Sequence, residues 1–302
     1  MRYPFQISIL YLKNGKMSKK ILFALLGKNL SHSFSPLMFN FYFRKLNLNY
    51  HYFPISLPEE SLLELLNKAR NSSILGMNVT IPYKEKIIPL LDELDSVSNK
   101  IRAVNVIKNK NGRLIGYNTD FSGFKRALEK YNFLDLKRAV ILGAGGAGRS
   151  VIYSLYTLNF EKIVFFSRTW QRINEIESNF SFINGLKGYL WDIRKIRKEI
   201  MESDVLINAT PVGMSPFLNA SPIEIDFPLK ENFLAFDLIY NPKLTKLLKM
   251  ASEKGSFIEN GIDMLIFQAV EGLKIWLEKK INEELFIKTC GEVINASISN
   301  SR

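Results

Sequence analysis

A glycine-rich segment at residues 143–148 carries the most specific chemistry in the sequence. It follows an apolar run at 139–142 and precedes a stretch with the apolar spacing of a helix, which is the setting that a dinucleotide-binding fingerprint requires. There Gly143 permits a tight turn, Gly145 lets the backbone approach a pyrophosphate, and Gly148 allows close packing of helix on strand. The helix start presents free N–H groups to the phosphates. The pattern assigns cofactor binding to Gly143, Gly145, Gly146, Ala147 and Gly148.

The end of the next predicted strand, at 162–166, indicates which dinucleotide is bound. An NAD site usually has Asp or Glu about 20 residues after the glycines, bonded to the ribose 2′-OH. Ser167, Arg168 and Thr169 stand at this place instead, and none is acidic. Thr169 is a candidate N-cap, which puts Arg172 in the first helical turn, where a cation opposes the helix dipole. Two arginines so placed favour an anion between them, the 2′-phosphate of NADP, over two ordinary surface arginines.

Two serines, Ser33 and Ser35, stand just before a predicted helix at 36–46. Their hydroxyls can cap that helix, or they can bind the hydroxyls or carboxylate of a small polar ligand. The sequence leaves both interpretations open. His32, which precedes Ser33, is interpreted as structural.

A lysine, Lys84, follows a predicted strand that ends at Thr80 and a predicted helix start at Pro82. In the first helical turn its charge is unfavourable unless something compensates it. The alternative is a solvent-facing lysine beside Lys86. Asp120 also begins a predicted helix, but an acid is favourable there, so its position alone shows little.

The elements that must position these residues alternate between strand and helix. Predicted strands lie at 21–26, 50–55, 75–80, 139–142, 162–166, 204–208 and 234–238. Predicted helices lie at 36–46, 58–69, from 82 onward, 120–131, 146–158, 170–178, 261–279 and 283–296. Strands 105–108 and 113–117 flank an Asn-Gly turn and predict a hairpin. Strands separated by helices predict parallel pairing with right-handed crossovers.

Composition excludes several classes of protein. The 302 residues are enough for two domains. One cysteine, Cys290, allows no intrachain disulfide, and with two histidines it cannot complete a Cys/His zinc site. The longest apolar run is far short of a membrane span. Residues 1–16 hold a short apolar patch without a signal-peptide cleavage site, so they are interpreted as a loose extension with Met17 as the effective start. The expected compartment is the reducing cytosol, and the expected location is cytoplasmic.

The net charge of +12 needs a separate explanation. Basic residues are spread over nearly every predicted helix, and the densest cluster is interpreted as a solvated helix face. That cluster is Arg194, Lys195, Arg197 and Lys198. No nucleic-acid motif accompanies it, so the excess fits an anionic small ligand or a lysine-rich composition at least as well as DNA.

Together these segments resemble the shikimate dehydrogenase family, NADP-dependent reductases of 3-dehydroshikimate in aromatic amino-acid biosynthesis. The similarity runs from about Gly27 to Gln268. Nine motifs carry it in order: Ser33-Phe-Ser35-Pro36, Asn78-Val-Thr-Ile-Pro-Tyr-Lys84, Ala103-Val-Asn105, Asn118-Thr-Asp120, residues 143–148, Ser167-Arg-Thr169, Asn208-Ala-Thr-Pro-Val-Gly-Met214, Asp237-Leu-Ile-Tyr240-Asn-Pro, and Asn260-Gly261 with Met264 and Gln268.

The resemblance implies a role for each matched residue and needs no metal. Lys84 and Asp120 would form the catalytic pair. The substrate would be held by Ser33, Ser35, Thr80, Asn105 and Gln268, with Tyr240 nearby. The nicotinamide would lie near Thr210, Gly261 and Met264. The chain departs from the family at Phe39, Val106 and Ser167, where the family often has His, Thr and Asn.

The expected fold is α/β, with a Rossmann NADP-binding domain, an α/β substrate domain and the substrate in a cleft between them. The expected boundaries are 1–16 for the extension, 17–119 for the substrate-binding domain, 120–260 for the Rossmann domain, and 261–302 for C-terminal helices that pack back on the substrate domain. The expected partner is a small-molecule substrate, without nucleic acid or membrane, for a monomer or homodimer. A quinate/shikimate dehydrogenase of broader specificity, a catalytically silent Rossmann binding module and a basic nucleic-acid binder are the alternatives.

Overall fold

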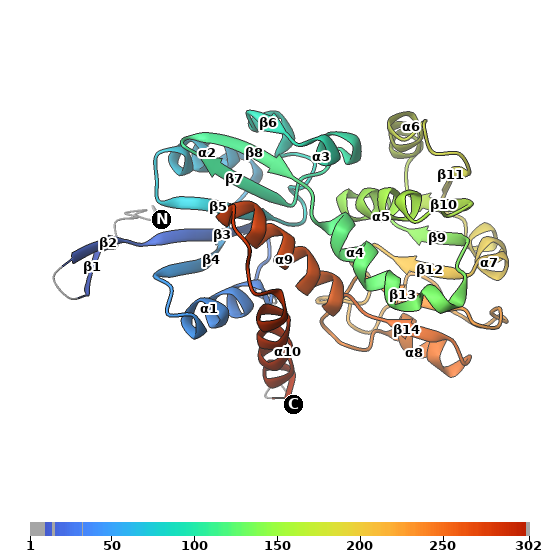
Figure 1. Cartoon of the computed structure of the whole chain (residues 1–302). Helices are drawn as coiled ribbons and strands as arrows, with labels where there is room; N and C mark the ends of the chain where they lie inside the picture. Colours follow the sequence, from blue (N-terminus) through green and yellow to red (C-terminus); the bar gives the residue numbers. More distant parts are fainter. Residues whose placement is uncertain (1–9, 14–15, 32, 300–302) are drawn as a thin grey trace. The chain divides into compact units, whose positions relative to one another are not determined.

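The computed structural model describes residues 10–13, 16–31 and 33–299 (Figure 1). The chain divides into two compact units. Unit 1 comprises Met1–Ser98, Val104–Tyr117 and Gly272–Arg302, and unit 2 comprises Asn99–Ala103 and Asn118–Glu271. Residues 261–271, which the sequence placed with the C-terminal helices, belong to unit 2, because helix α9 (Ile262–Leu277) begins in one unit and ends in the other.

Unit 1 is built on a mixed six-stranded sheet with the strand order β4-β3-β5-β7-β8-β6. Its strands are β3 (Ile21–Gly27), β4 (Tyr50–Ser56), β5 (Ile74–Val79), β6 (Glu93–Leu94), β7 (Val106–Lys110) and β8 (Arg113–Tyr117). Its helices are α1 (Ser35–Lys45), α2 (Leu62–Arg70), the first half of α3 (Ser96–Ile101) and α10 (Glu283–Ser299). Strands β4, β3 and β5 are parallel, whereas β7 pairs antiparallel with both β5 and β8.

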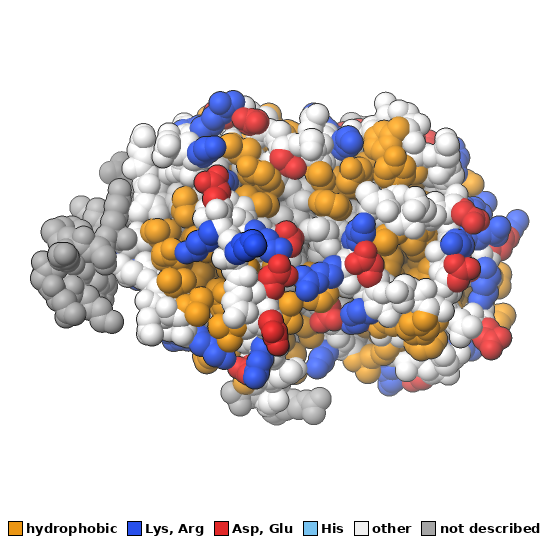
Figure 2. Space-filling view, viewed as in Figure 1, with side chains coloured by type: hydrophobic (Ala, Val, Ile, Leu, Met, Phe, Trp, Pro, Cys, Tyr) orange, Lys and Arg blue, Asp and Glu red, His pale blue; other side chains and the backbone are white. Residues whose placement is uncertain are grey.

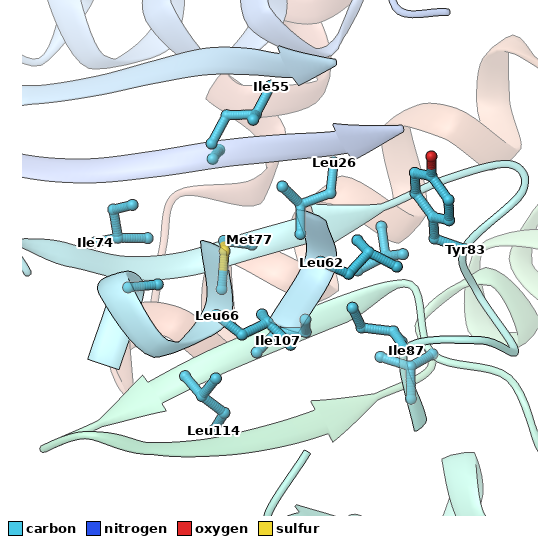
Figure 3. Close-up of a cluster of buried hydrophobic side chains, with 14 of the residues drawn as sticks. Leu26, Ile55, Leu62, Leu66, Ile74, Met77, Tyr83, Ile87, Ile107 and Leu114 are labelled. Carbon is cyan, nitrogen blue, oxygen red and sulfur yellow. The ribbon is translucent and has the colours of Figure 1, made fainter. Parts of the chain in front are cut away.

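The core of unit 1 lies on both faces of this sheet. On one face, apolar side chains of β5 and β7, such as Met77 and Ile107, pack with Leu66 of α2 (Figure 3). On the other face, the Trp276 ring lies so close to Gly76 that a Cβ there would come within 2.2 Å of it. The Trp276 indole N–H donates to the Ile107 carbonyl at 3.0 Å. The end of α9 is thereby fixed on the sheet.

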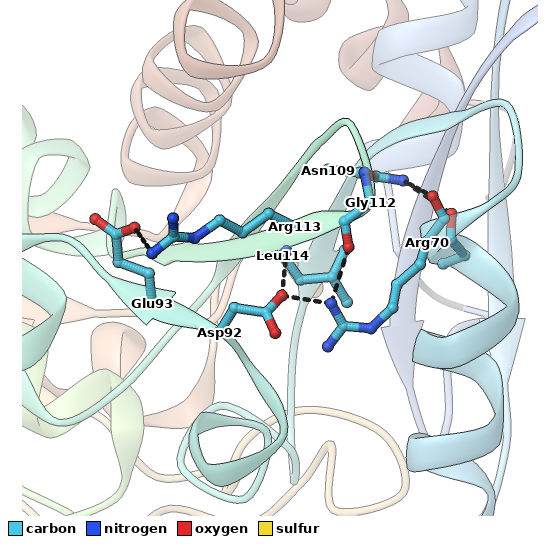
Figure 4. A network of polar contacts seen from close by, with 8 residues as sticks. Arg70, Asp92, Glu93, Asn109, Gly112, Arg113 and Leu114 are labelled. Atoms are coloured by element: carbon cyan, nitrogen blue, oxygen red, sulfur yellow. Dashed lines mark hydrogen bonds and ion pairs between the residues drawn. The ribbon is translucent and has the colours of Figure 1, made fainter.

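The predicted hairpin is confirmed, and a polar network fastens it to α2 (Figure 4). The Asn109 carboxamide accepts the Gly112 N–H at 2.8 Å and donates to the Ala69 carbonyl at 2.8 Å. The Arg70 guanidinium donates to the Gly112 carbonyl at 2.9 Å and pairs with Asp92. These bonds fix the strand β7, which follows Asn105.

Unit 2 is built on a parallel six-stranded sheet with the strand order β11-β10-β9-β12-β13-β14. Its strands are β9 (Arg138–Leu142), β10 (Lys162–Ser167), β11 (Leu186–Leu190), β12 (Val205–Asn208), β13 (Leu234–Asp237) and β14 (Phe257–Glu259). Its helices are α4 (Asp120–Leu128), α5 (Gly146–Thr157), α6 (Trp170–Asn179), α7 (Ile193–Glu202), α8 (Lys246–Glu253) and most of α9. Counted within the unit, this order is 3-2-1-4-5-6, the doubly wound Rossmann order, so the Rossmann prediction is confirmed.

The helix predicted from Pro82 is wrong. Residues 81–87 form turns, followed by a short 3₁₀ helix at Ile88–Leu90. The Lys84 carbonyl, which a helix would give to residue 88, accepts the Val104 N–H at 2.7 Å, and the Ile88 N–H turns back to Glu85. The expected parallel pairing also fails at this point, because β5 pairs antiparallel with β7 although α3 lies between them in the chain.

Part of the expected loose extension is paired. Strands β1 (Leu10–Lys13) and β2 (Lys16–Lys19) form an antiparallel pair. Ile7 and Ile9 of the apolar patch lie outside the described residues, as does His32. Within the described part of the chain, no helix is both long and apolar enough to cross a membrane.

The basic cluster of α7 forms ion pairs on a helix surface. Lys195 pairs with Glu199 at 2.9 Å, and Arg197 pairs with Asp226 at 2.8 Å. Figure 2 shows basic and acidic side chains interspersed over the face in view. The interpretation of this cluster as a solvated face agrees with these pairs.

Candidate active site

The glycine loop of unit 2 follows β9 at the place where the strand order reverses, where open α/β sheets bind ligands. Gly143 has φ +108°, a conformation that favours glycine. A Cβ on Gly148 would lie 2.3 Å from the Gly143 carbonyl oxygen, so α5 packs closely against the turn. At Gly145 a Cβ would meet nothing within 4 Å. The loop therefore fits a pyrophosphate beside Gly145, with the first amides of α5 directed to it.

The end of β10 is followed by the predicted cap of the next helix, α6. The Thr169 hydroxyl accepts the Arg172 N–H at 3.4 Å and caps α6, as expected. Arg168 is exposed at the end of β10. The Arg172 guanidinium lies 3.3 Å from the Glu175 carboxylate, which also bonds the buried Arg149 at 3.1 Å. This edge carries two cations and no strand-end acid, so it fits the 2′-phosphate of NADP.

Unit 1 brings polar side chains to the end of β5. The Tyr52 hydroxyl donates to the Asn78 carboxamide oxygen at 2.7 Å, and the Asn78 amide donates to the Asn105 carbonyl at 3.2 Å. All three residues are buried. Asn40 bonds the backbone of Tyr52 in both directions, at 2.7 and 2.9 Å. The chain at Asn105 is therefore held rigidly beside the end of β5.

Lys84 and Thr80 lie in the segment that follows β5. The Thr80 N–H donates to Leu26 at 2.8 Å, which anchors it to β3. Lys84 is half-buried, and its carbonyl is bound by Val104, the residue before Asn105. The structure thus gathers Thr80, Lys84 and Asn105 around one set of loops within unit 1.

The serines take different positions. The Ser33 hydroxyl accepts the Ser35 N–H at 3.3 Å, which supports the capping interpretation for Ser33. Ser35 is the first residue of α1 and is buried. The N-cap residue, Phe34, makes no side-chain cap bond.

Within unit 2, Asp120 and Gln268 lie on two helices in contact. Asp120 is buried at the start of α4, and the preceding Thr119 hydroxyl donates to the Gln268 carboxamide oxygen at 3.4 Å. A Cβ on Gly123 would lie 2.7 Å from the Met264 carbonyl oxygen and 2.8 Å from Gln268. Glycine at 123 allows α4 and α9 to approach this closely.

Sequence reasoning gave no role to Tyr52 or Asp237. Tyr52 is the fixing group for Asn78, and Asp237 ends β13 beside Asn208 of β12. A sequence signal for Asn208 and Asp237 exists, because each is a polar residue that directly ends an apolar strand. Tyr52, inside a strand of mixed polarity, has no such signal.

No metal centre is evident in residues 10–13, 16–31 and 33–299, where no group of three His, Cys, Asp or Glu side chains could hold a metal ion.

Burial lowers the pKa of His51 below its ordinary value, and nearby Lys20 adds to this effect.

Comparisons with known proteins agree on one family. The family model for the shikimate dehydrogenase substrate binding domain matches residues 25–107, and the model for shikimate / quinate 5-dehydrogenase matches residues 125–243. A relative from Halothermothrix orenii, a shikimate dehydrogenase (NADP(+)), is 39% identical over 276 residues, covering 90% of this chain and 95% of the relative.

Solved structures give the same result. A shikimate dehydrogenase in complex with NADP+ has a TM-score of 0.80 and 35% identity, covering 91% of this chain and 96% of that chain. The Thermus thermophilus shikimate 5-dehydrogenase, solved with NADP(H) and shikimate, has a TM-score of 0.78 and 32% identity, covering 90% and 99%. Because these matches span both units, the chain belongs to the shikimate dehydrogenase family.

Proposed function

We propose that this chain catalyses the reversible, NADPH-dependent reduction of 3-dehydroshikimate to shikimate in aromatic amino-acid biosynthesis. The identity of 39% across 90% of the chain to a relative named shikimate dehydrogenase (NADP(+)) carries the proposal. The glycine loop of unit 2 and the polar strand ends of unit 1 support it.

The cofactor is NADP, which supplies or accepts the hydride when bound. Its pyrophosphate would lie on residues 143–148, and its 2′-phosphate on the edge formed by Ser167, Arg168, Thr169 and Arg172. Arginine suits this role because its planar guanidinium binds phosphate in a bidentate manner. Thr210, Gly261 and Met264 would contact the nicotinamide end.

The substrate is a polyhydroxylated ring acid. Hydroxyl and amide side chains discriminate such a ring through hydrogen bonds that a substrate without the hydroxyl leaves unmade. The proposed set is Ser33, Ser35, Thr80, Asn105, Tyr240 and Gln268. Since Ser33 also caps α1, its hydroxyl proton remains available to a ligand oxygen while its lone pair accepts the Ser35 N–H.

Lys84 and Asp120 are proposed as the catalytic pair. In the reductive direction negative charge builds on the ketone oxygen, and the Lys84 ammonium would stabilise or protonate it. Asp120 would orient the lysine. The proposal requires both groups to act on one bound substrate.

A quinate dehydrogenase is the second candidate, because the family model for residues 125–243 includes quinate in its description. The test is NADP+ reduction with shikimate, with quinate and without substrate. We expect shikimate to be used far more efficiently than quinate. Higher efficiency with quinate would support the second candidate. If neither substrate reduces NADP+, the remaining interpretation is a catalytically silent Rossmann binding module.

We further propose a cytoplasmic location, without nucleic-acid or membrane partners, and a monomer or homodimer. The chain has one cysteine, Cys290, which is buried, so its fold needs no intrachain disulfide and fits a reducing compartment. Light scattering measures the molar mass in solution and so distinguishes a monomer from a homodimer. Binding of DNA tighter than the ~10⁻⁴–10⁻⁶ M that is typical of non-specific association at physiological salt would contradict the proposal on nucleic acid.

A further inference from the structure

Two neighbouring strands of unit 2 end in buried polar side chains. Asn208 ends β12 and Asp237 ends β13, and the parallel register places them side by side. Both are fully buried at 0% exposure. A carboxylate in such a place is unusual, since burial disfavours its charge. Its hydrogen bonds show what it holds.

The Asn208 carboxamide fixes the loop that follows β12. Its oxygen accepts both the N–H and the hydroxyl of Thr210, at 3.0 and 2.7 Å. Its amide donates to the Val212 carbonyl at 3.1 Å and to the Asp237 carboxylate at 3.0 Å. Only one orientation of the Asn208 amide makes all four bonds, and the bond to Asp237 is one of those that favour it.

The Asp237 carboxylate fixes the loop that follows β13. One oxygen accepts the Ile239 N–H at 3.0 Å together with the Asn208 amide, and the other accepts the Thr245 hydroxyl at 2.7 Å. Thr245 in turn caps α8 by accepting the Leu248 N–H at 3.3 Å. The carboxylate thus has three donors from three segments of the chain.

The same loop touches the start of α9. The Ile239 carbonyl accepts the Gly261 N–H at 3.0 Å. A Cβ on Gly261 would lie 2.0 Å from the Leu238 carbonyl oxygen, so the two segments are in direct contact. A shift of residues 238–239 would therefore move Gly261.

We propose that Asp237 is a positioning residue that sets the two loops and the helix start that carry Thr210, Tyr240 and Gly261. This inference rests on the proposed function, in which those three residues face the nicotinamide and the substrate. Asp237 itself touches neither ligand. Because a misplacement of reacting atoms by about 1 Å can cost about a hundredfold in rate, loosening this network should slow the chemical step more than it weakens cofactor binding.

A purely structural carboxylate would behave differently. Burying an ionised group is costly, and well-packed apolar residues often replace such groups without loss of stability. What an apolar residue cannot do is accept three N–H or O–H groups in fixed directions. The test therefore needs a variant that keeps the accepting oxygen and one that removes it.

Asp237→Ala removes the acceptor, and Asp237→Asn keeps it. The asparagine oxygen can accept from Asn208 and Ile239 while its amide donates to the Thr245 hydroxyl oxygen. Asp204 provides the matched control. At the opposite end of β12, its carboxylate accepts three donors: the Lys137 and Arg138 N–H groups at 2.9 and 2.8 Å, and the Lys230 ammonium at 2.9 Å.

The readouts are kcat, the dissociation constant of NADP+, and hydrogen–deuterium exchange of the unliganded chain. Asp237→Ala should lower kcat at least about tenfold and leave NADP+ affinity within about threefold, since the phosphate-binding segments are elsewhere. Exchange should rise in residues 209–214 and 238–245. Asp237→Asn should keep kcat within about threefold of wild type, and Asp204→Ala should leave kcat and these two segments unchanged.

Thr245→Val keeps the assay decisive if Asp237→Ala does not fold. It removes one donor to the carboxylate, together with the cap of α8, with little change of shape, so exchange at 238–245 should rise and kcat should fall by about threefold. Unchanged exchange and kcat in this variant would overturn the proposal. A wild-type kcat in folded Asp237→Ala, or an equal loss in Asp204→Ala, would also overturn it. If the wild-type chain does not oxidise shikimate, the proposed function fails, while the exchange data still decide whether Asp237 holds the two loops.

Discussion

Each unit buries a polar network at the ends of its strands, and the two networks differ in charge. In unit 1, Tyr52, Asn78 and the Asn105 carbonyl bond through a phenol and neutral amide groups. In unit 2, Asn208 bonds to Asp237, an ionisable carboxylate. Both networks connect segments far apart in the sequence, yet only the second contains a carboxylate, which changes charge in acidic solution, whereas a phenol ionises only at about pH 10.

The difference matches the two ligands proposed. Neutral hydroxyl and amide groups distinguish ring hydroxyls through direction rather than charge. The phosphates of NADP are better recognised by backbone amides at a helix start and by arginines. Apart from Lys84, the proposed groups of unit 1 are neutral, so changes in pH should act first on the network of unit 2.

The largest effect is expected at Lys84, the charged member of the otherwise neutral set of unit 1. Lys84→Ala should lower kcat at least about a hundredfold, because positioned proton transfer and charge stabilisation contribute ~10²–10⁴ in rate. The KM for shikimate should change much less, since the hydroxyl-binding residues remain. Steady-state kinetics measure both.

The matched control is Lys86, two residues along the same turns, whose ammonium pairs with Glu59 at the surface. Lys86→Ala should be nearly silent. Asp120→Ala should also be severe, and the double variant with Lys84→Ala should be little worse than the worse single one, because residues that act as a unit are not additive. A folded Lys84→Ala variant with more than half of the wild-type kcat would contradict the mechanism.

The next effect is on stability and sharpens the contrast in charge. Burial raises the pKa of Asp237 from its ordinary 3.8 to about 6, partly offset by its hydrogen bonds to Thr245, Ile239 and Asn208, all neutral. The folded chain therefore binds this proton more tightly than the unfolded chain. Ionising Asp237 therefore costs more free energy in the folded chain than in the unfolded chain. This loss of stability is absent below about pH 4, grows up to about pH 6 and is then constant. About two pKa units correspond to roughly 3 kcal/mol.

Urea unfolding of the wild type and of Asp237→Asn at several pH values measures this pH-dependent loss of stability. As the pH rises from about 4 to about 7, the free energy of unfolding of the wild type should fall relative to that of the variant. A difference between the two proteins that stays constant over this range would contradict the account.

A smaller effect is expected for cofactor choice. NADP+ should exceed NAD+ in kcat/KM by well over tenfold, since a charge-assisted phosphate contact contributes about 1.5–3 kcal/mol. Arg168→Ala with Arg172→Ala should abolish most of this preference. Arg194→Ala with Lys198→Ala on α7 is the control and should leave it intact. Equal use of both cofactors by the wild type would refute the assignment of the 2′-phosphate site.

The smallest effect is expected at Tyr52. Tyr52→Phe removes the hydroxyl that fixes Asn78, at a cost of about 1 kcal/mol, so the KM for shikimate should rise about fivefold while NADP+ affinity is unchanged. Tyr42→Phe is the control, because it removes a buried hydroxyl that bonds the backbone of Asn282 on the C-terminal side of unit 1. Equal effects of both variants would mean general weakening of unit 1.

The Rossmann unit was predictable from sequence because its signals are local. Gly143, Gly145 and Gly148 stand between an apolar strand and an amphipathic helix, and Thr169 lies one residue before the next helix. Each pattern depends on neighbours a few residues away, and the structure confirms the turn, the close packing and the cap. The Asn109–Gly112 turn was predictable for the same reason.

The prediction failed where distant residues decide the local structure. The carbonyl of Lys84 is taken by Val104, twenty positions away, and this replaces the helix predicted from Pro82. Likewise, Asn208 and Asp237 meet only because β12 and β13 pair in one register. Local patterns contain no information on that register.

Transfer of a labelled hydride tests the proposed reaction directly. Shikimate carrying deuterium on the ring carbon that bears the reacting hydroxyl is incubated with NADP+ and the wild-type chain, and the NADPH formed is analysed by mass spectrometry. We expect one deuterium in each NADPH molecule and none released to solvent, because the hydride would pass directly from the ring to the bound nicotinamide. Unlabelled NADPH, or no NADPH from a folded chain, would contradict it.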